Sequence, residues 1–288
     1  MSEPLWSRVT VVGCGLIGAS FALAVRRAGA AARIAGWDTS PETLREALAR
    51  GVIDEADGSF GGGAVSPSDL VYLAMPVGEI IRFLRERGGQ VKPGALVTDA
   101  GSTKREVCRA ARECLPKDRA FVGGHPVAGS HLGGLAHADA NLFAGAPYVL
   151  TVDEDDAGRG PDENFAAQVA ALEETLRRVG ARVVRALARE HDRALAFVSH
   201  LPQVVSSALA ACVEAQGAAV SSLAGAGYRD MTRLAASPWS VWGDILATNR
   251  DSVADALDAL VVRLSSVREE LRASPALDAT RALFKEQT

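Results

Sequence analysis

The spacing of hydrophobic positions changes character near residue 186. Before that point, short apolar runs alternate with stretches in which apolar residues recur at helical spacing. The short runs end at glycine, proline or aspartate, which is typical of strands buried on both faces of a parallel sheet. They predict strands at residues 9–12, 33–37, 69–75, 95–99, 121–122, 148–152 and 182–184. This alternation predicts an α/β domain at residues 1–186, with a Rossmann-type, doubly wound parallel sheet.

Residues 187–288 keep a helical period and contain no convincing strand, so we expect a second, all-α domain. Its most apolar segment, residues 195–213, also carries Ser, His, Pro and Gln, which favours a core helix of a soluble protein over a membrane span. Pro202 removes one helical N–H and leaves the Val198 carbonyl without its partner, which predicts a local irregularity in that helix.

The first predicted strand runs into a turn with the sequence Gly-Cys-Gly-Leu-Ile-Gly. Gly13 permits the tight strand-to-helix turn, Gly15 lets a pyrophosphate approach the backbone, and Gly18 lets the helix pack closely on the sheet. The following helix begins with Leu16 and Ile17, and the N–H groups at its start favour phosphate. The turn therefore predicts a dinucleotide site; a purely structural glycine turn is the alternative.

Asp38 ends the second predicted strand, 20 residues after Gly18. An acidic side chain at this spacing binds the ribose hydroxyls of NAD and repels a 2′-phosphate, so we expect NAD rather than NADP. Met75 and Pro76 lie at the end of another predicted strand and are expected at the same cofactor site.

Composition narrows the function classes. With 288 residues, of which 48 % are apolar, the chain can bury a large core, and a formal net charge of −4 gives no electrostatic footprint for nucleic acid. The four cysteines show no Cys-x-x-Cys spacing, so we expect reduced thiols in a cytoplasmic protein without a membrane partner. His131 and His137 have no acidic or thiol partner at ligand spacing, so we expect no metal site.

Two strand ends carry candidate catalytic side chains. The first is Asp-Ala-Gly-Ser-Thr-Lys, where Thr103 and Glu106 fit a capping box that would leave the Ser102 hydroxyl facing the crevice at the strand ends. Alternatively, Ser102 shares in the capping. The second is Gly-Gly-His-Pro-Val-Ala-Gly-Ser, in which His125 is held by a restricted backbone in a strand-end loop. Histidine titrates near neutrality and suits a general base; a core histidine is the alternative.

The helical domain adds a polar stripe. Ser199, Gln203 and Ser206 follow one another at helical spacing, with His200 on the shoulder, and we expect the stripe to face a wet crevice. A stripe that serves helix packing is the alternative. His191 and His200 are nine residues apart, on opposite helix faces, and so do not act as a pair.

Further along the chain, Arg229 and Arg233 are four residues apart, so they would point the same way from a helix. Guanidinium groups suit carboxylates. An isolated surface pair is the alternative.

Together these stretches resemble the prephenate and arogenate dehydrogenase family of tyrosine biosynthesis. The resemblance covers nearly the whole chain. It rests on the glycine turn with Asp38, on Asp-Ala-Gly-Ser-Thr-Lys, on Gly-Gly-His-Pro-Val-Ala-Gly-Ser, on Ser-His-Leu-Pro at residues 199–202, and on Gly-Tyr-Arg-Asp-Met-Thr-Arg at residues 227–233. It implies a helical domain (residues 187–288) through which two subunits form a homodimer.

The resemblance also implies roles for individual residues. His125 matches the histidine that hydrogen-bonds the ring hydroxyl of the substrate, Ser102 the serine that orients it, and Arg233 the arginine that binds a carboxylate. Ser199 matches a residue near the nicotinamide, and Arg229 one that reaches toward the neighbouring subunit.

His200, Gln203 and Ser130 are expected at the substrate as well. Many relatives read Ser-His-Leu-Pro-His, whereas this chain has Gln203 at the last position, which puts the choice of substrate in doubt. A neutral amide donates a hydrogen bond but carries no charge.

The implied reaction is NAD-dependent oxidative decarboxylation of a cyclohexadienol. We expect prephenate to be used better than arogenate, because the loop after His125 offers no acid for the ammonium of arogenate and Asp230 lies between two arginines. A β-hydroxyacid-type dehydrogenase is a rival interpretation, but that class uses a lysine in the helical domain, and the body of this one has none. A non-enzymatic NAD-sensing regulator would need a basic or DNA-reading segment, which is absent.

Overall fold

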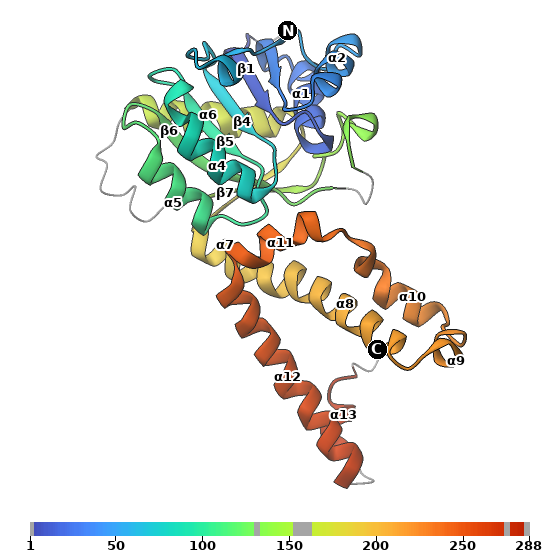
Figure 1. The fold of residues 1–288 in the computed structure, drawn as a ribbon. Coiled ribbons are helices and arrows are strands. Elements are labelled where there is room, and N and C mark those ends of the chain that lie inside the picture. The colour runs from blue at the N-terminus through green and yellow to red at the C-terminus, as the bar shows by residue number, and fades with distance from the viewer. Residues whose placement is uncertain (1–2, 130–132, 152–162, 274–276, 285–288) are drawn as a thin grey trace. The chain divides into compact units, whose positions relative to one another are not determined.

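The computed structural model describes residues 3–129, 133–151, 163–273 and 277–284 (Figure 1). The chain divides into two compact units, each described by itself below. The Rossmann unit comprises residues 1–192 together with residues 239–248. The helical unit comprises residues 193–238 and residues 249–288.

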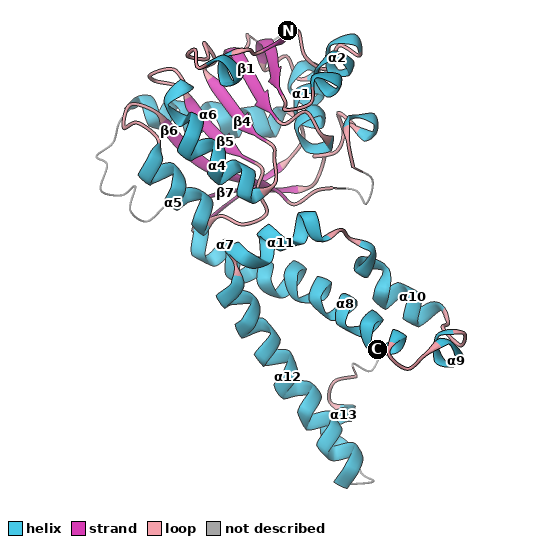
Figure 2. Ribbon diagram, viewed as in Figure 1, coloured by secondary structure: helices cyan, strands magenta, loops and turns pink. Residues whose placement is uncertain are grey.

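The Rossmann unit is built on one eight-stranded sheet in the order β3-β2-β1-β4-β5-β6-β7-β8 (Figure 2). Its strands are β1 (Trp6–Val12), β2 (Ala31–Trp37), β3 (Glu55–Ala56), β4 (Leu70–Leu73), β5 (Leu96–Asp99), β6 (Ala120–Pro126), β7 (Pro147–Thr151) and β8 (Arg182–Ala186). The crossover between β3 and β4 is the topological switch that leaves a crevice beyond the end of β1. The Rossmann-type fold expected from the sequence is confirmed.

One pairing departs from the all-parallel sheet that the sequence predicts. β6 and β7 are antiparallel, with His125 opposite Val149, while all other neighbours in the sheet are parallel. A parallel crossover needs a connection that returns the chain to the starting end, usually a helix. The described residues between β6 and β7 contain only the short 3-10 helix η2 (Leu135–His137), so the chain turns back from the same end.

Helices cover both faces of the sheet, as doubly wound strands require. They are α1 (Leu16–Arg27), α2 (Pro41–Ala49), α3 (Ser59–Gly62), α4 (Val77–Arg87), α5 (Arg105–Cys114) and α6 (Glu163–Arg178). The unit also contains η1 (Gly88–Gln90), the first turn of α7 (Ala188–Leu195) and α11 (Trp239–Thr248). Alternate residues of β1 enter different cores: Val9 and Val11 pack with α1 and α6, and Val12 packs with α4 and α5. Phe21 stacks on Tyr72, with ring centroids 3.8 Å apart, at the centre of the first core.

The described part of the helical unit contains no strand, in agreement with the all-α expectation. Its elements are η4 (Ala196–His200), α8 (Leu201–Glu214), α9 (Ala218–Ser221), α10 (Ala226–Thr232), η5 (Arg233–Ala236), α12 (Arg250–Ala273) and α13 (Asp278–Arg281). η4 is a π-helical turn that ends two residues before Pro202, so the irregularity predicted there is confirmed.

The expectation of a core helix at residues 195–213 is wrong for the chain as described. The continuous helix Ala188–Glu214 keeps most of its apolar window unburied, and by length and composition alone it could cross a membrane. Val198, for example, is 73 % exposed. Length and apolarity are weak evidence for a span, since a helix that packs against another protein chain meets the same criteria.

Candidate active site

The glycine turn between β1 and α1 has the geometry of a phosphate-binding loop. Gly13 has φ of +91°, which only glycine adopts without strain, and a Cβ on Gly18 would lie 1.9 Å from the Gly13 carbonyl oxygen. A Cβ on Gly15 would meet no atom within 4 Å. Gly13 and Gly18 therefore serve the turn and the packing, while Gly15 faces open space at the start of α1, where no side chain caps the helix.

Asp38 closes the other side of this loop. Its two carboxylate oxygens accept hydrogen bonds from the backbone N–H groups of Cys14 (2.9 Å) and Ser40 (2.8 Å). Burial, and then the Asp38 charge, raise the pKa of the Cys14 thiol to about 12, so this cysteine stays a neutral thiol.

A cavity of about 690 Å³ opens at this point, with a lining that includes Gly13, Gly15, Trp37, Asp38, Met75 and Pro76. Five of the expected cofactor residues are thus brought together. Leu16 and Ile17 begin the neighbouring helix α1. Open space at Gly15, uncapped N–H groups and a carboxylate at the far side are what a dinucleotide requires, so the residues present fit such a cofactor.

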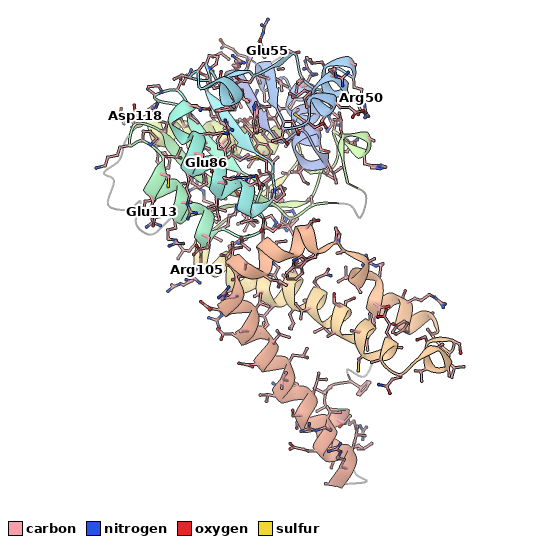
Figure 3. The ribbon with its side chains drawn as sticks, viewed as in Figure 1. Arg50, Glu55, Glu86, Arg105, Glu113 and Asp118 are labelled. Atoms are coloured by element: carbon pink, nitrogen blue, oxygen red, sulfur yellow. The ribbon has the colours of Figure 1, made fainter. Side chains whose placement is uncertain are left out.

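Four charged side chains of α4 also line the cavity, and the sequence analysis did not connect them with it: Glu79, Arg82, Glu86 and Arg87. Glu86 is labelled on α4 in Figure 3. Arg82 forms an ion pair with Glu79, and Arg87 lies over the Trp37 ring, 5.4 Å from its centroid. The sequence pattern of α4 does not indicate that this helix lies near Asp38, because α4 and Asp38 come together only when the sheet has folded.

His125 lies within β6 and is 8 % exposed, so the expectation of a strand-end loop is wrong. Hydrogen bonds hold its ring rather than the glycines alone. Nδ1 of His125 lies 2.8 Å from Nε2 of His191, and Nδ1 of His191 lies 2.8 Å from a carboxylate oxygen of Asp192. We call these three side chains the relay.

The relay determines which nitrogen of the neutral His125 ring carries the proton. The Asp192 carboxylate also accepts from two backbone N–H groups, so it acts as an acceptor throughout, and His191 must donate to it from Nδ1. In the neutral ring, Nε2 of His191 then accepts from Nδ1–H of His125. The remaining nitrogen, Nε2 of His125, carries a lone pair.

Asp192 also corrects the prediction of a capping box at α5. The helix begins at Arg105, and the Asp192 carboxylate accepts from the backbone N–H groups of Lys104 (2.7 Å) and Arg105 (2.9 Å). The Thr103 hydroxyl instead pairs with the Thr248 hydroxyl at 2.7 Å. An aspartate far away in sequence therefore replaces the local cap. Ser102 is half-buried beside this helix start.

The polar stripe of α8 packs against η5 within the helical unit. Gln203 Nε2 donates to the Leu234 carbonyl (2.8 Å), and the Ser206 hydroxyl accepts from the Ala235 N–H (3.1 Å). Both side chains are buried and bonded to η5, as the packing alternative requires, while Gln203 Oε1 has no hydrogen-bond partner among the described residues. Their bonds hold the turn that begins with Arg233, which is exposed.

The other expected residues of the helical unit are spread over separate elements. His200 is 1 % exposed, with Nδ1 3.2 Å from the Asn249 amide nitrogen, which favours packing over a substrate contact. Ser199 is half-buried in η4. Arg229 belongs to α10 and donates to the Ala224 carbonyl, whereas Arg233 starts η5. Ser130, like His131, lies outside the described residues.

Comparison with known families gives the fold and the site a context. Residues 21–185 match the family described as "Prephenate dehydrogenase, nucleotide-binding domain", and residues 187–286 match "Prephenate dehydrogenase, dimerization domain". The chain belongs to the prephenate dehydrogenase family.

Individual members of the prephenate dehydrogenase family are similar over most of their length. The prephenate dehydrogenase of Bacillus subtilis is 36 % identical over 264 residues, which are 90 % of this chain and 69 % of the relative. The structure of the A. aeolicus prephenate dehydrogenase, in complex with hydroxyphenyl propionate and NAD+, is 28 % identical with a TM-score of 0.85, covering 98 % of this chain and 96 % of that one. The Synechocystis arogenate dehydrogenase is 29 % identical with a TM-score of 0.79, covering 96 % of both chains.

Membership of the prephenate dehydrogenase family decides against the β-hydroxyacid-type and regulator interpretations. The sequence did not predict the role of His191 in the relay, because local spacing relates it only to His200, on the opposite face of the helix. The true partner of His191 is 66 residues earlier in the chain. The adjacent pair His191-Asp192 was the available signal, since a carboxylate next to a histidine can orient its ring.

Proposed function

We propose that this chain catalyses the NAD-dependent oxidative decarboxylation of prephenate to 4-hydroxyphenylpyruvate. The observation that carries the proposal is a buried histidine, His125, bonded through His191 to the buried Asp192 carboxylate, in the same compact unit as the glycine turn and its cavity. Bound NAD supplies the acceptor for the hydride that leaves the carbinol carbon.

The relay supports the proton transfer. The lone pair on Nε2 of His125 takes the proton of the ring hydroxyl as the carbinol carbon loses its hydride. The ring of His125 then carries a positive charge. His191 passes the stabilising effect of the Asp192 carboxylate to it through two hydrogen bonds of 2.8 Å.

Decarboxylation needs no further base. Oxidation of the carbinol gives a dienone in which the ring carboxylate is a vinylogous β-keto acid. The C–C bond to the carboxylate breaks, CO2 leaves, and its electron pair enters the ring, which becomes aromatic and yields the phenol after proton uptake. Arg233 is our candidate for binding a substrate carboxylate. Ser102 is our candidate for orienting the ring hydroxyl, and Ser199 for a position near the nicotinamide.

Gln203 favours a second candidate substrate, arogenate. Its amide nitrogen must face the Leu234 carbonyl, so Oε1 points the other way, and this buried oxygen has no hydrogen-bond partner among the described residues. An unpaired buried acceptor costs roughly 1–3 kcal/mol. An ammonium group would satisfy it, whereas a keto group would not.

The test is to mix the purified protein with NAD and either prephenate or arogenate and to follow NADH absorbance. We expect turnover of prephenate at the higher kcat/KM; a ratio of ten or more in favour of arogenate would replace the first substrate by the second. Replacing NAD with NADP should lower kcat/KM, because Asp38 repels a 2′-phosphate and Arg82 is held by Glu79. Equal efficiency with NADP would remove Asp38 from cofactor selection.

We also propose that the working enzyme is a homodimer formed through the helical unit. The unit exposes large apolar side chains on several helices and on the turn after α9: Phe197, Val198, Leu223, Met231, Val262 and Leu264. A second copy would remove this area from water, which the dimerization-domain match of residues 187–286 supports. Light scattering after size exclusion measures the mass, and a monomer at micromolar concentration would contradict the proposal.

A further inference from the structure

A fully buried ion pair lies next to the relay and takes no part in the chemistry proposed above. Asp99 ends β5, and Lys104 precedes α5; both side chains are 0 % exposed, and the Lys104 ammonium contacts an Asp99 carboxylate oxygen. Removing two charges from water is costly, and an apolar pair of the same volume is often as stable. Stability alone therefore does not account for the pair.

The bonds of this pair reach two specific backbone positions. One Asp99 oxygen accepts from the Gly124 N–H (3.0 Å), the other accepts from the Gly101 N–H (2.8 Å), and Lys104 Nζ donates to the Gly124 carbonyl (2.6 Å). Gly124 directly precedes His125, and Gly101 directly precedes Ser102. One ion pair thus binds the backbone immediately before both candidate site residues.

On its other side β6 stays paired with β7 at Gly124 and His125, but the ladder that joins β6 to β5 does not reach these residues. The ladder between β5 and β6 ends at the pair Thr98–Val122, two residues short of Gly124. Beyond that point, the side chains of Asp99 and Lys104 replace the backbone rungs. The approach is close: a Cβ on Gly124 would lie 2.4 Å from the Asp99 carbonyl oxygen.

The pair is also joined to the relay. The backbone N–H of Lys104 donates to the Asp192 carboxylate at 2.7 Å. Lys104 therefore binds both Gly124, through its ammonium group, and the carboxylate end of the relay. Asp99 and Lys104 therefore make hydrogen bonds at Asp192 and at the residues directly before Ser102 and His125.

We propose that Asp99 and Lys104 are a positioning pair that sets the place of His125 relative to Ser102. The proposal rests on the proposed function for the roles of His125 and Ser102. Misplacing a reacting group by about 1 Å can cost a hundredfold in rate, so the pair acts on turnover rather than on cofactor binding.

The test is the double variant Asp99→Asn/Lys104→Met, which removes both charges and leaves neither one unpaired. We expect kcat to fall by roughly tenfold to a hundredfold. The Kd for NAD, followed through the quenching of intrinsic tryptophan fluorescence, to which Trp37 in the cofactor cavity contributes, should stay within threefold. The melting temperature should fall less than that of the single variant Lys104→Met, because no unpaired charge remains buried, although asparagine offers one acceptor oxygen to the two backbone N–H groups that Asp99 binds. The single variant Lys104→Met, which leaves Asp99 buried and unpaired, should melt well below both.

A matched control comes from the ion pair of Lys92 with Asp69, which lies at the opposite ends of β4 and β5. The variant Asp69→Asn/Lys92→Met removes the same chemistry from the same sheet and should leave kcat unchanged. The positioning role is overturned if the Asp99/Lys104 double variant keeps kcat within threefold of the wild type, or if the control loses as much.

A readout independent of turnover separates this proposal from the function it rests on. The imidazole N–H protons of the relay should give downfield proton resonances, which the double variant should shift or lose and the Asp69/Lys92 variant should keep. If the wild type oxidises neither dienol, the proposed function fails, and these resonances still decide whether the pair positions His125. Unchanged resonances in the double variant would overturn the pair's role.

Discussion

At the scale of single residues, two glycines of the glycine motif differ in whether they can accommodate a side chain. A Cβ on Gly15 would meet nothing, whereas a Cβ on Gly18 would lie 1.9 Å from a backbone oxygen. Gly15→Ala should therefore keep the melting temperature and weaken NAD binding, because the methyl group stands where the pyrophosphate approaches.

Gly18→Ala should instead lower stability, typically by 1–3 kcal/mol as an estimate for overpacking. Thermal melts and NAD titrations on both variants distinguish the two roles. A Gly15→Ala protein that binds NAD as tightly as the wild type would mean that the pyrophosphate lies elsewhere.

His125 offers the sharpest test of the proton transfer. Asparagine keeps a hydrogen bond to the hydroxyl but cannot take its proton, so His125→Asn should lower kcat by about 10²–10⁴ with little change in KM. Steady-state kinetics measure both constants, and near-normal turnover would exclude His125 as the base.

At the scale of elements, α5 depends on a distant residue for its first turn. The sequence predicts a local cap by Thr103 and Glu106, but Asp192 accepts the N–H groups of Lys104 and Arg105. Asp192→Ala should cost at least 1–2 kcal/mol, a typical figure for a lost N-cap, and should also lower kcat by removing the end of the relay.

The control is Glu106→Ala, which removes only an exposed ion pair with Arg109 and should change stability by less than about 0.5 kcal/mol. Urea denaturation of both variants makes the comparison. If Glu106→Ala lost more stability than Asp192→Ala, the predicted capping box of Thr103 and Glu106 would be correct after all.

Local patterns explain which elements were predictable. The strand that ends at Asp99 follows from a short apolar run, and the helix that begins at Pro41 follows from the Ser40 cap and the proline after it. Each of these signals lies within a few positions of the element that it predicts. The antiparallel β7, the Asp192 cap and the His125–His191 bond join residues dozens of positions apart. Hydrophobic period carries no information about such partners, because they meet only when the sheet has formed.

The same reason separates the parts of the site that could be predicted from those that could not. Gly13, Gly15 and Asp38 stand at fixed spacings along one strand–helix–strand unit, so their cofactor role can be predicted from their order in the chain. His191 and the arginines of α4 reach the site through tertiary packing. Gln203 was noticed, but its bond to the Leu234 carbonyl, and hence the direction of its free oxygen, required the folded chain.

At the scale of the whole molecule, the chain returns to the Rossmann unit after leaving it. α11 belongs to that unit, where Asp244 accepts from the Gly78 N–H (2.9 Å) at the start of α4 and Thr248 pairs with Thr103. A cut at residue 186 would therefore remove α11 and the relay residues of α7 from the unit that they complete. The Rossmann unit is therefore incomplete without residues that follow position 186.

Acid stability is a property of the whole Rossmann unit that depends on Asp57. This carboxylate is buried and accepts from the hydroxyls of Thr10 (2.8 Å) and Ser66 (2.7 Å) and from the Ser59 N–H (3.0 Å). Burial acts to raise its pKa, but the hydrogen bonds together outweigh burial and lower it. A pKa that is lower in the folded state stabilises the protein above the unfolded value, near 3.9, and this stabilisation is lost as the pH falls through the folded value.

Asp57→Asn should therefore lose stability at pH 7, by roughly 1–3 kcal/mol for a broken buried network, and its deficit should shrink as the pH is lowered from 5 to 3. The wild type approaches the variant in acid because its own carboxylate becomes protonated there. Urea denaturation followed by circular dichroism at pH 7, 5 and 3 gives the free energies of unfolding. The exposed Asp118, labelled in Figure 3, provides the control Asp118→Asn, which should follow the wild type at each pH. A deficit for Asp57→Asn that is constant from pH 7 to pH 3 would show that the Asp57 charge contributes nothing to folding.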